Sequence, residues 1–502
     1  MINQFIFLLF LIILGTILMF FLKNHLSPLN IYLLSLPMGF AAWLFLTTVI
    51  ILLFSPIIQW LICFIYIVTI VLLLVIQGNK IFSSTYWKST LFFWNFFFIF
   101  SFLFLKFNFS ILSNDSWTLT IAGKSFPSTK IFVESLFSFT GIYSIILHSS
   151  SSIFGFDYLY ALFPLIALFF FLSFLYNLNL SLSSITSTSI LPQLKPQQKT
   201  MSPFSNFIHK LKLNFKPYSL LSTFLVFSSF FIIFNSFYIH SNLLTGVYSF
   251  IALFGLWKRA SQGNKAWLLV SWGALFTSCL LRIEGPFFAL IIIILLISVN
   301  SISYQEKFCY VGLLSLLMVL WHAYLACILS GFTHKYVLTS HRALLIMALY
   351  IAAFILLILS QKISLRRLKK YFPLAMVYSL TLGWSFIIFT RGLIEKGNML
   401  ILERYGILTL NVLKNGGWGI LWVILTVLFI ICLLLKRFPY ESLFTYYILS
   451  FFLIFNILNL YRGGWREGWG DSGNRMLIQG IFIVAFYTFY KSGRLLLSNL
   501  QK

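Results

Sequence analysis

The sequence predicts an all-α polytopic membrane protein with about 15 transmembrane helices (13–15), for two reasons. The 502 residues are 60% hydrophobic and 9% charged, which lies outside the range of soluble globular proteins. Apolar runs of about 20 residues recur along the chain, and a helix of that length crosses a hydrocarbon core of roughly 30 Å. No long polar stretch separates these runs, so we expect one integral-membrane domain over residues 1–502.

Fifteen segments have the length and composition of a membrane span. They cover approximately residues 4–22, 30–54, 57–77, 90–108, 157–176, 219–238, 243–257, 266–281, 286–303, 309–330, 343–361, 372–390, 417–435, 442–460 and 477–490. We expect the first segment to be a retained span rather than a removable signal peptide. No basic region precedes it, and no small-residue cleavage site follows it.

The distribution of charge favours a membrane, and not nucleic acid, as the partner of this basic chain. The formal net charge is +25. If the spans alternate in direction, one set of loops holds 22 of the 35 Lys and Arg but only two of the ten acids, Glu306 and Glu441, a net charge of +20. The other set holds 13 basic and eight acidic residues, a net charge of +5. The positive-inside rule places the first set in the cytoplasm, with the amino terminus outside and the carboxyl terminus in the cytoplasm.

The outer loops would then carry most of the acids together with several arginines. The acids are Asp115, Glu134, Asp157, Glu284, Glu395, Glu403, Glu467 and Asp471. The arginines are Arg282, Arg391, Arg404, Arg462, Arg466 and Arg475. Because Asp and Glu contribute little to orientation, their presence on this face fits a polar binding or reaction chamber. The alternative is that loops between spans simply collect charge.

Two long loops differ in character. Segment 177–218 is rich in Ser, Pro, Gln and Lys, and we expect it to be a flexible cytoplasmic linker. The first long outer loop, residues 109–156, carries Glu134 and His148 at helical spacing beside apolar residues. This pattern predicts an amphipathic helix at the outer interface that presents both residues to a substrate. The alternative is an interfacial helix whose polar residues only face water.

The last outer loop, "YRGGWREGWGDSGNR", gathers Arg462, Arg466 and Arg475 among several glycines. Arginine offers a planar fork of donors suited to phosphate, and glycine lets backbone N–H groups approach an anion closely. These arginines are therefore candidates to bind a phosphate or pyrophosphate headgroup. The alternative is a glycine-rich turn that Trp and Arg anchor at the interface.

A further outer feature, "LLRIEGPFF", places Arg282 and Glu284 at the junction of two spans. Ions at such a position are costly unless they are paired or functional, so both are candidate substrate-binding residues. The alternative is that they pair only with each other or with segment 391–406, which adds Arg404 on the same side.

The sequence gives little support to nucleotide hydrolysis or to a metal site. "AGKS" at 122–125 looks like the end of a phosphate-binding loop, but that pattern requires Gly where the chain has Thr118, which argues against nucleotide hydrolysis. The five cysteines lie inside or at the edges of apolar runs, and the histidines lack ligand spacing. We therefore expect no cofactor and no transition-metal site.

The acid of "NDSWTLT", the interfacial helix behind it, "RIEG" and "NRMLIQGIFIVAF" together resemble the GT-C superfamily of polytopic glycosyltransferases. This class includes relatives of the protein O-mannosyltransferases and bacterial enzymes that modify lipid A or cell-surface glycans. The resemblance covers about residues 90–490, and residues 1–89 add three amino-terminal spans. Where the family often has an acidic pair, this chain has Asn114 and Asp115, so a divalent metal is compatible with the motif but not supported by it.

The resemblance implies transfer of a sugar from a polyprenyl phosphate to a lipid, glycan or protein acceptor, on the non-cytoplasmic face of a bacterial inner membrane. Asp115 matches the family's catalytic acid. It would activate the acceptor hydroxyl, while the outer arginines hold the leaving phosphate. The membrane lipid and the lipid-linked donor are the implied partners, and the oligomeric state is not predicted.

Two other functions compete with this interpretation. A polysaccharide polymerase or ligase would also use arginine-rich outer loops on a lipid-linked sugar, without needing the acid. A transporter or lipid-handling protein would place ionisable residues near mid-bilayer, often on broken helices.

Overall fold

The helices of this protein pack around one central helix. The structure is a computed structural model, and it describes residues 2–20, 22, 26–53, 84–107, 161–187, 217–237, 241–329, 340–361, 367–394, 398–435, 438–462 and 472–499. These residues form helices and no strand. Among them, seven helices are long and apolar enough to cross a membrane, or eight if one bent pair counts as a single span. The chain is therefore compatible with a multi-pass membrane protein, while the count of 15 spans and the GT-C-like arrangement stay predictions.

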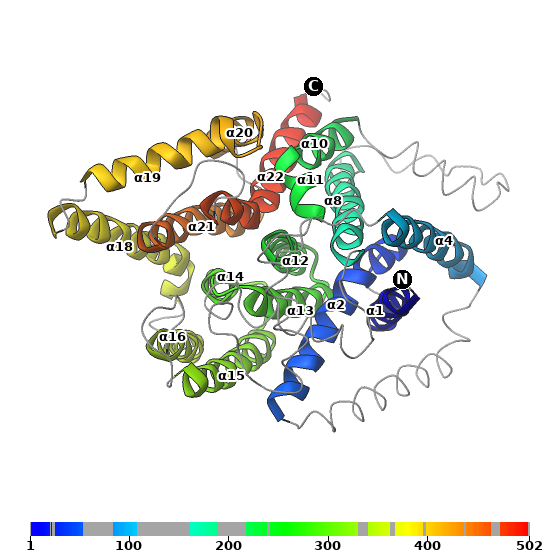
Figure 1. Ribbon diagram of the computed structural model, residues 1–502, viewed down its shortest axis with the longest axis horizontal. Helices are drawn as coiled ribbons and strands as arrows, with labels where there is room; N and C mark the ends of the chain where they lie inside the picture. Colours follow the sequence, from blue (N-terminus) through cyan, green and yellow to red (C-terminus); the bar gives the residue numbers. More distant parts are fainter. Residues whose placement is uncertain are drawn as a thin grey trace.

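The described helices follow one another along the chain as Figure 1 shows. They are α1 (Ile2–Phe20), α2 (Pro28–Leu53), α4 (Ser84–Phe107), α8 (Leu162–Ser187), α10 (Pro217–Phe227), α11 (Phe230–Phe237), α12 (Ser241–Gln262), α13 (Ala266–Leu281), α14 (Gly285–Ser298), α15 (Tyr304–Leu329), α16 (Ser340–Leu359), the 3-10 helix η1 (Lys369–Tyr371), α18 (Phe372–Ile394), α19 (Asn398–Leu410), the π-helix η2 (Asn411–Asn415), α20 (Leu421–Leu434), α21 (Glu441–Arg462) and α22 (Ser472–Asn499).

Each predicted span other than 57–77, which lies outside the described residues, overlaps one of these helices. Two predictions need correction. Segment 219–238 is not one straight span, because α10 and α11 meet at a bend of 67°. Residues 398–415, expected to be loop, form α19 and η2.

Helix α12 lies near the middle of the bundle (Figure 1), and its residues from Ser241 to Ala260 are all buried. Small residues let its neighbours approach closely. A Cβ at Gly246 would lie 2.5 Å from the carbonyl oxygen of Ile478 in α22, and one at Gly255 would lie 2.8 Å from that of Trp267 in α13. In lipid the hydrophobic effect does not drive helices together, so close backbone packing of this kind stabilises their contacts instead.

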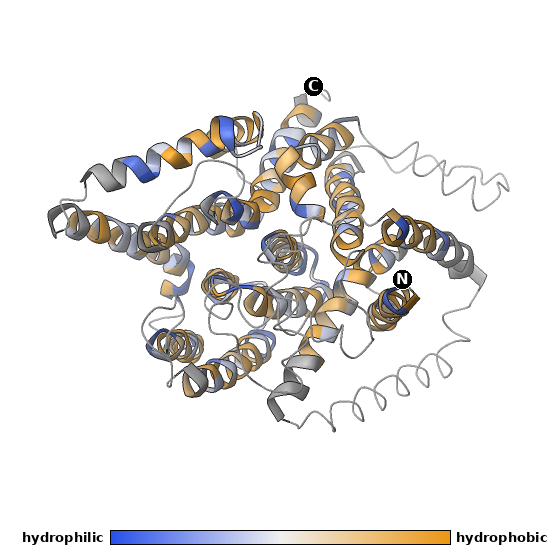
Figure 2. Cartoon of the chain, viewed as in Figure 1, coloured by the Kyte–Doolittle hydropathy of each residue, from blue (hydrophilic) through white to orange (hydrophobic). Residues whose placement is uncertain are grey.

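The peripheral helices instead expose large apolar side chains. Leu382 and Phe386 of α18 are 71% and 66% exposed, and Leu434 of α20 is 83% exposed. Figure 2 shows apolar residues on the outer helices as well as in the centre of the bundle. Exposed apolar surface of this extent is expected where helices face lipid rather than water.

The contacts of α12 define two opposite ends of the bundle. Helix α22 runs parallel to α12, since the rings of Phe254 and Phe486 lie 5.2 Å apart and Gly246 lies beside Ile478. Helix α13 runs antiparallel, with the hydroxyls of Ser249 and Ser278 2.9 Å apart. The end of the bundle at which α12 finishes is called the Arg259 end. The Arg282 end is the opposite one, where α12, α14 and α22 begin and α13 finishes.

The described contacts also orient α21 and α10 relative to α22. Helix α21 runs antiparallel to α22, because Glu441 pairs with Lys491 while Phe451 packs on Gly480. Helix α10 also runs antiparallel to α22, because Tyr218 is hydrogen-bonded to Ser492 at 2.6 Å while the rings of Phe227 and Phe482 lie 5.5 Å apart. The starts of α10 and α21 and the end of α22, which were all assigned to the cytoplasmic face, therefore lie at the same end of the bundle.

The contact between α1 and α2 gives a direct test of close packing. A Cβ at Gly39 of α2 would overlap the carbonyl oxygen of Leu11 in α1. We expect Gly39→Ala to push the two helices apart and to lower the free energy of unfolding by about 1–3 kcal/mol, the usual cost of overpacking. Thermal denaturation of the purified protein in detergent measures this.

Gly383→Ala in α18 is the matched control, because a Cβ there meets nothing within 4 Å. It should leave the melting temperature unchanged or raise it slightly, since Ala favours helix over Gly. Equal melting temperatures for the two variants would contradict close packing of α1 on α2.

Candidate functional site

The candidate functional site is the Arg282 end, where a tight turn joins α13 to α14. Arg282 has an extended backbone (φ −150°, ψ 157°) and ends α13, and a proline in the first turn then favours the start of α14. A Cβ at Gly285 would overlap the carbonyl oxygen of Ser278, so only glycine fits there without a shift. The turn is therefore short and leaves Arg282 and Glu284 side by side.

Arg282 and Glu284 form a buried ion pair. The Arg282 Nε donates to Glu284 Oε2 at 3.0 Å, and Nη2 donates to Oε1 at 3.3 Å. The two residues are 6% and 2% exposed. Glu284 lies at the N-cap position of α14, where the helix macrodipole also favours a negative charge. The structure thus brings together these two predicted substrate-binding residues, and each is the partner of the other.

A cluster of buried amide side chains lies at the same end and was not predicted. Gln479 of α22 donates through Nε2 to Oδ1 of Asn242 in α12 at 3.1 Å. Asn474, in the first turn of α22, donates through Nδ2 to the carbonyl oxygen of Gly416 at 3.0 Å. It also accepts a hydrogen bond from the indole N–H of Trp418. Neutral amides both donate and accept, so this cluster joins α12, α22 and the turn before α20 without any charge.

Two helix breaks meet beside the amide cluster. The bend between α10 and α11 falls at Ser228 and Ser229, and the backbone N–H of Phe231 donates to the carbonyl oxygen of Gly417 at 3.0 Å. Gly417 follows the π-helix η2 and has a φ of +74°, which favours glycine. The rings of Phe231 and Trp418 lie 4.4 Å apart. The sequence did not predict this contact, because it joins residues almost two hundred positions apart.

The structure describes only some of the other predicted site residues. Arg475 follows Asn474 in the first turn of α22 and is half-buried at the Arg282 end. Arg404 is half-buried on α19, where the neighbouring Tyr405 accepts a hydrogen bond from Trp384 of α18 at 3.1 Å. The predicted residues outside the described part of the chain are Asp115, Glu134, His148, Arg466 and the side chain of Arg462.

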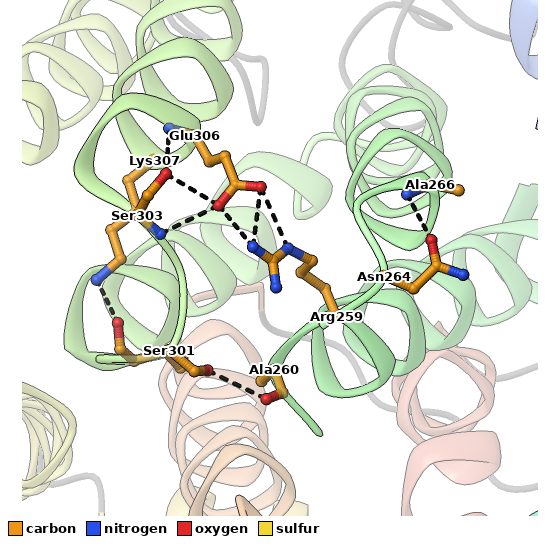
Figure 3. Close-up of polar contacts among 9 residues, drawn as sticks. Arg259, Ala260, Asn264, Ala266, Ser301, Ser303, Glu306 and Lys307 are labelled. Atoms are coloured by element: carbon orange, nitrogen blue, oxygen red, sulfur yellow. Dashed lines mark hydrogen bonds and ion pairs between the residues drawn. The ribbon is translucent and has the colours of Figure 1, made fainter. Parts of the chain in front are cut away.

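The Arg259 end has a different charge arrangement, shown in Figure 3. Arg259 of α12 pairs with Glu306 of α15 through Nη2 and Oε2 at 2.7 Å. The same carboxylate accepts the backbone N–H of Ser303 at 3.1 Å, while the Ser303 hydroxyl accepts the N–H of Glu306 at 3.3 Å. This reciprocal arrangement is a capping box at the start of α15. The ammonium of Lys307 donates to the carbonyl oxygen of Ile297 at 2.9 Å.

Glu441 likewise accepts a backbone N–H and pairs with a cation at the start of α21. Its Oε2 accepts the backbone N–H of Phe438 at 2.9 Å, and its Oε1 accepts the hydroxyl of Tyr487 at 2.7 Å. The ammonium of Lys491 pairs with the same carboxylate. The two acids assigned to the basic face are therefore both held by cations from neighbouring helices.

No group of three or more His, Cys, Asp or Glu that could hold a metal ion occurs within the described residues. Comparison of the chain with protein-family models, with curated proteins and with solved structures found no significant match.

The ion pair of the Arg282 end predicts a double-mutant cycle. Arg282→Met should lower the free energy of unfolding by about 3–5 kcal/mol, because it leaves the Glu284 carboxylate buried without its cation. The double variant Arg282→Met, Glu284→Gln removes both charges and should recover much of this loss. Melting temperatures of the single and double variants in detergent measure the coupling. Additive losses would contradict a pair whose members depend on each other.

Proposed function

We propose that the chain is a glycosyltransferase that moves a sugar from a polyprenyl-phosphate donor to a lipid, glycan or protein acceptor at the Arg282 end. The observation that carries this proposal is the contrast between the two ends. At the Arg259 end, Glu306 and Glu441 are bound by cations, and the surrounding loops are basic. The positive-inside rule favours a cytoplasmic position for that end. The Arg282 end, with its arginines, acid and amides, would then face the non-cytoplasmic side of a bacterial inner membrane.

The chemistry requires a base for the acceptor hydroxyl and positive charge for the leaving phosphate. The carboxylate of Asp115 would take the proton of the acceptor hydroxyl, whose oxygen bonds to the anomeric carbon of the sugar. The bond from that carbon to the phosphate oxygen would break, and its electron pair would leave with the polyprenyl phosphate. Arg475, with Arg462 and Arg466 of the preceding loop, would stabilise the negative charge that grows there.

Other predicted residues have supporting roles in this proposal. Arg282 is held by Glu284, so this ion pair would fix the position of the guanidinium beside the donor phosphate. Glu134 and His148 would line the acceptor side, and Arg404 would be a more distant phosphate contact. The lipid-facing surfaces of helices such as α18 and α20 would lie beside the prenyl chain of the donor.

A transporter or lipid-handling protein is the second candidate, and one observation favours it. Broken helices mark the substrate site in many transporters, and here the bend between α10 and α11 meets the π-helix η2. A polysaccharide polymerase or ligase remains an alternative within the same chemistry, with no described contact that favours it.

The role of Asp115 is tested by Asp115→Asn. We expect transfer of labelled sugar from a polyprenyl-phosphate donor, measured in membranes that contain the protein, to fall about 10²–10⁴-fold, which is the usual contribution of a general base. Donor binding should change little. Glu403→Gln, which removes an exposed carboxylate of α19, should leave transfer unchanged.

Unchanged transfer by the Asp115 variant would remove this residue from the mechanism. Donor binding without turnover by any form, across a panel of lipid-linked sugars, would favour transport instead.

A further inference from the structure

Lys258 of α12 is a buried cation at the Arg259 end that no carboxylate among the described residues neutralises. The residue is 2% exposed, and its ammonium donates one hydrogen bond, to the Ser181 hydroxyl of α8 at 3.2 Å. The ammonium also lies 5.0 Å from the ring of Trp257 and 5.3 Å from that of Phe254. The three N–H donors of the ammonium therefore have one hydroxyl and two aromatic rings as partners.

The acids of this end are already occupied. Glu306 is bound by Arg259, and Glu441 by Lys491. The remaining buried cation of α15, Lys307, donates to the carbonyl oxygens of Ile297 and Val299. Among the described buried cations of this end, Lys258 alone has neither a carboxylate nor a carbonyl partner.

The sequence supplies no further side-chain carboxylate nearby. No Asp or Glu occurs between Asp157 and Glu284, so α8, the 177–218 segment and α10 to α13 contain none. Glu284 itself lies at the Arg282 end, bound to its arginine. A carboxylate side chain from this part of the chain therefore cannot neutralise Lys258.

Two weaker interactions stabilise the Lys258 ammonium, but they do not replace an anion. Lys258 lies in the last turns of α12, where the macrodipole favours a cation, and the two rings add cation–π attraction. Each of these contributions is smaller than the cost of leaving an ion buried and unpaired. A ligand with negative charge would remove that cost.

We propose that Lys258 anchors an anion-binding site for a phosphate group at the Arg259 end, and that the headgroup of an anionic lipid supplies it. The exposed residues Ser261 and Gln262 lie within one turn of Lys258, so the buried ammonium lies close to the end of the bundle, where a headgroup would approach it. Basic pockets between helices on a cytoplasmic face bind phosphate headgroups by this chemistry. The site is separate from the proposed transferase site at the other end of α12.

Thermal melting of the purified protein in detergent tests this proposal. Added phosphatidylglycerol should raise the melting temperature more than an equal amount of phosphatidylcholine. Lys258→Met should lose this excess, whereas Lys265→Met, which removes an exposed cation of the same end, should retain it. Inorganic phosphate as effective as phosphatidylglycerol would identify free phosphate, and not lipid, as the ligand. An equal excess in Lys258→Met and the unmodified protein would overturn the proposal.

Ser181→Asp provides a second test that does not depend on the folding of the lysine variant. An aspartate at this position would place a carboxylate beside the ammonium, because the Ser181 hydroxyl already lies 3.2 Å away. This variant should melt at a higher temperature than the unmodified protein without lipid, and it should respond equally to the two lipids. A retained preference for phosphatidylglycerol would contradict a site at Lys258.

Discussion

The three ion-paired carboxylates of the described residues lie where helices begin and where a cation can reach them. Glu284, Glu306 and Glu441 lie at the starts of α14, α15 and α21, and they pair with Arg282, Arg259 and Lys491. Burying an ion in a medium of low dielectric costs several kcal/mol, and the N-terminal dipole, the free backbone N–H groups and the cation together offset this cost. With only ten acids in the chain, these positions determine where the described ion pairs can form.

The need to pair each of these carboxylates is met differently at the two ends of the bundle. At the Arg259 end, the pairs join α12 to α15 and α21 to α22, so the carboxylates hold different helices together. At the Arg282 end, the pair lies within one turn, and neutral amides make the described connections between α12 and α22. Asn474, which precedes Arg475 in the first turn of α22, ties that turn to the carbonyl oxygen of Gly416 through a neutral amide.

Run length and composition predicted the helices, because a span needs an uninterrupted apolar run and little else. The bend between α10 and α11 was not predicted, since Ser228 and Ser229 are a short interruption of its apolar run and the bend is stabilised by the distant Gly417. Helix α19 was missed because charged residues interrupt its apolar pattern. The Arg282–Glu284 pair was one of two predicted alternatives. The amide cluster was overlooked, although Asn474 and Gln479 both lie in "GNRMLIQ", because isolated neutral amides give no charge pattern.

The geometry of the two helix breaks bears on the choice between transfer and transport. A transporter requires a break that changes conformation, whereas a transferase requires fixed positions around the reacting atoms. Here the N–H of Phe231 donates to the carbonyl oxygen of Gly417, and the N–H of Gly416 donates to the carbonyl oxygen of Asn411 at 2.8 Å. Asn474 then ties Gly416 and Trp418 to the start of α22. Movement of either break would leave several of these polar groups unpaired at a cost of about 1–3 kcal/mol each, so the breaks are better suited to hold α22 in place than to open.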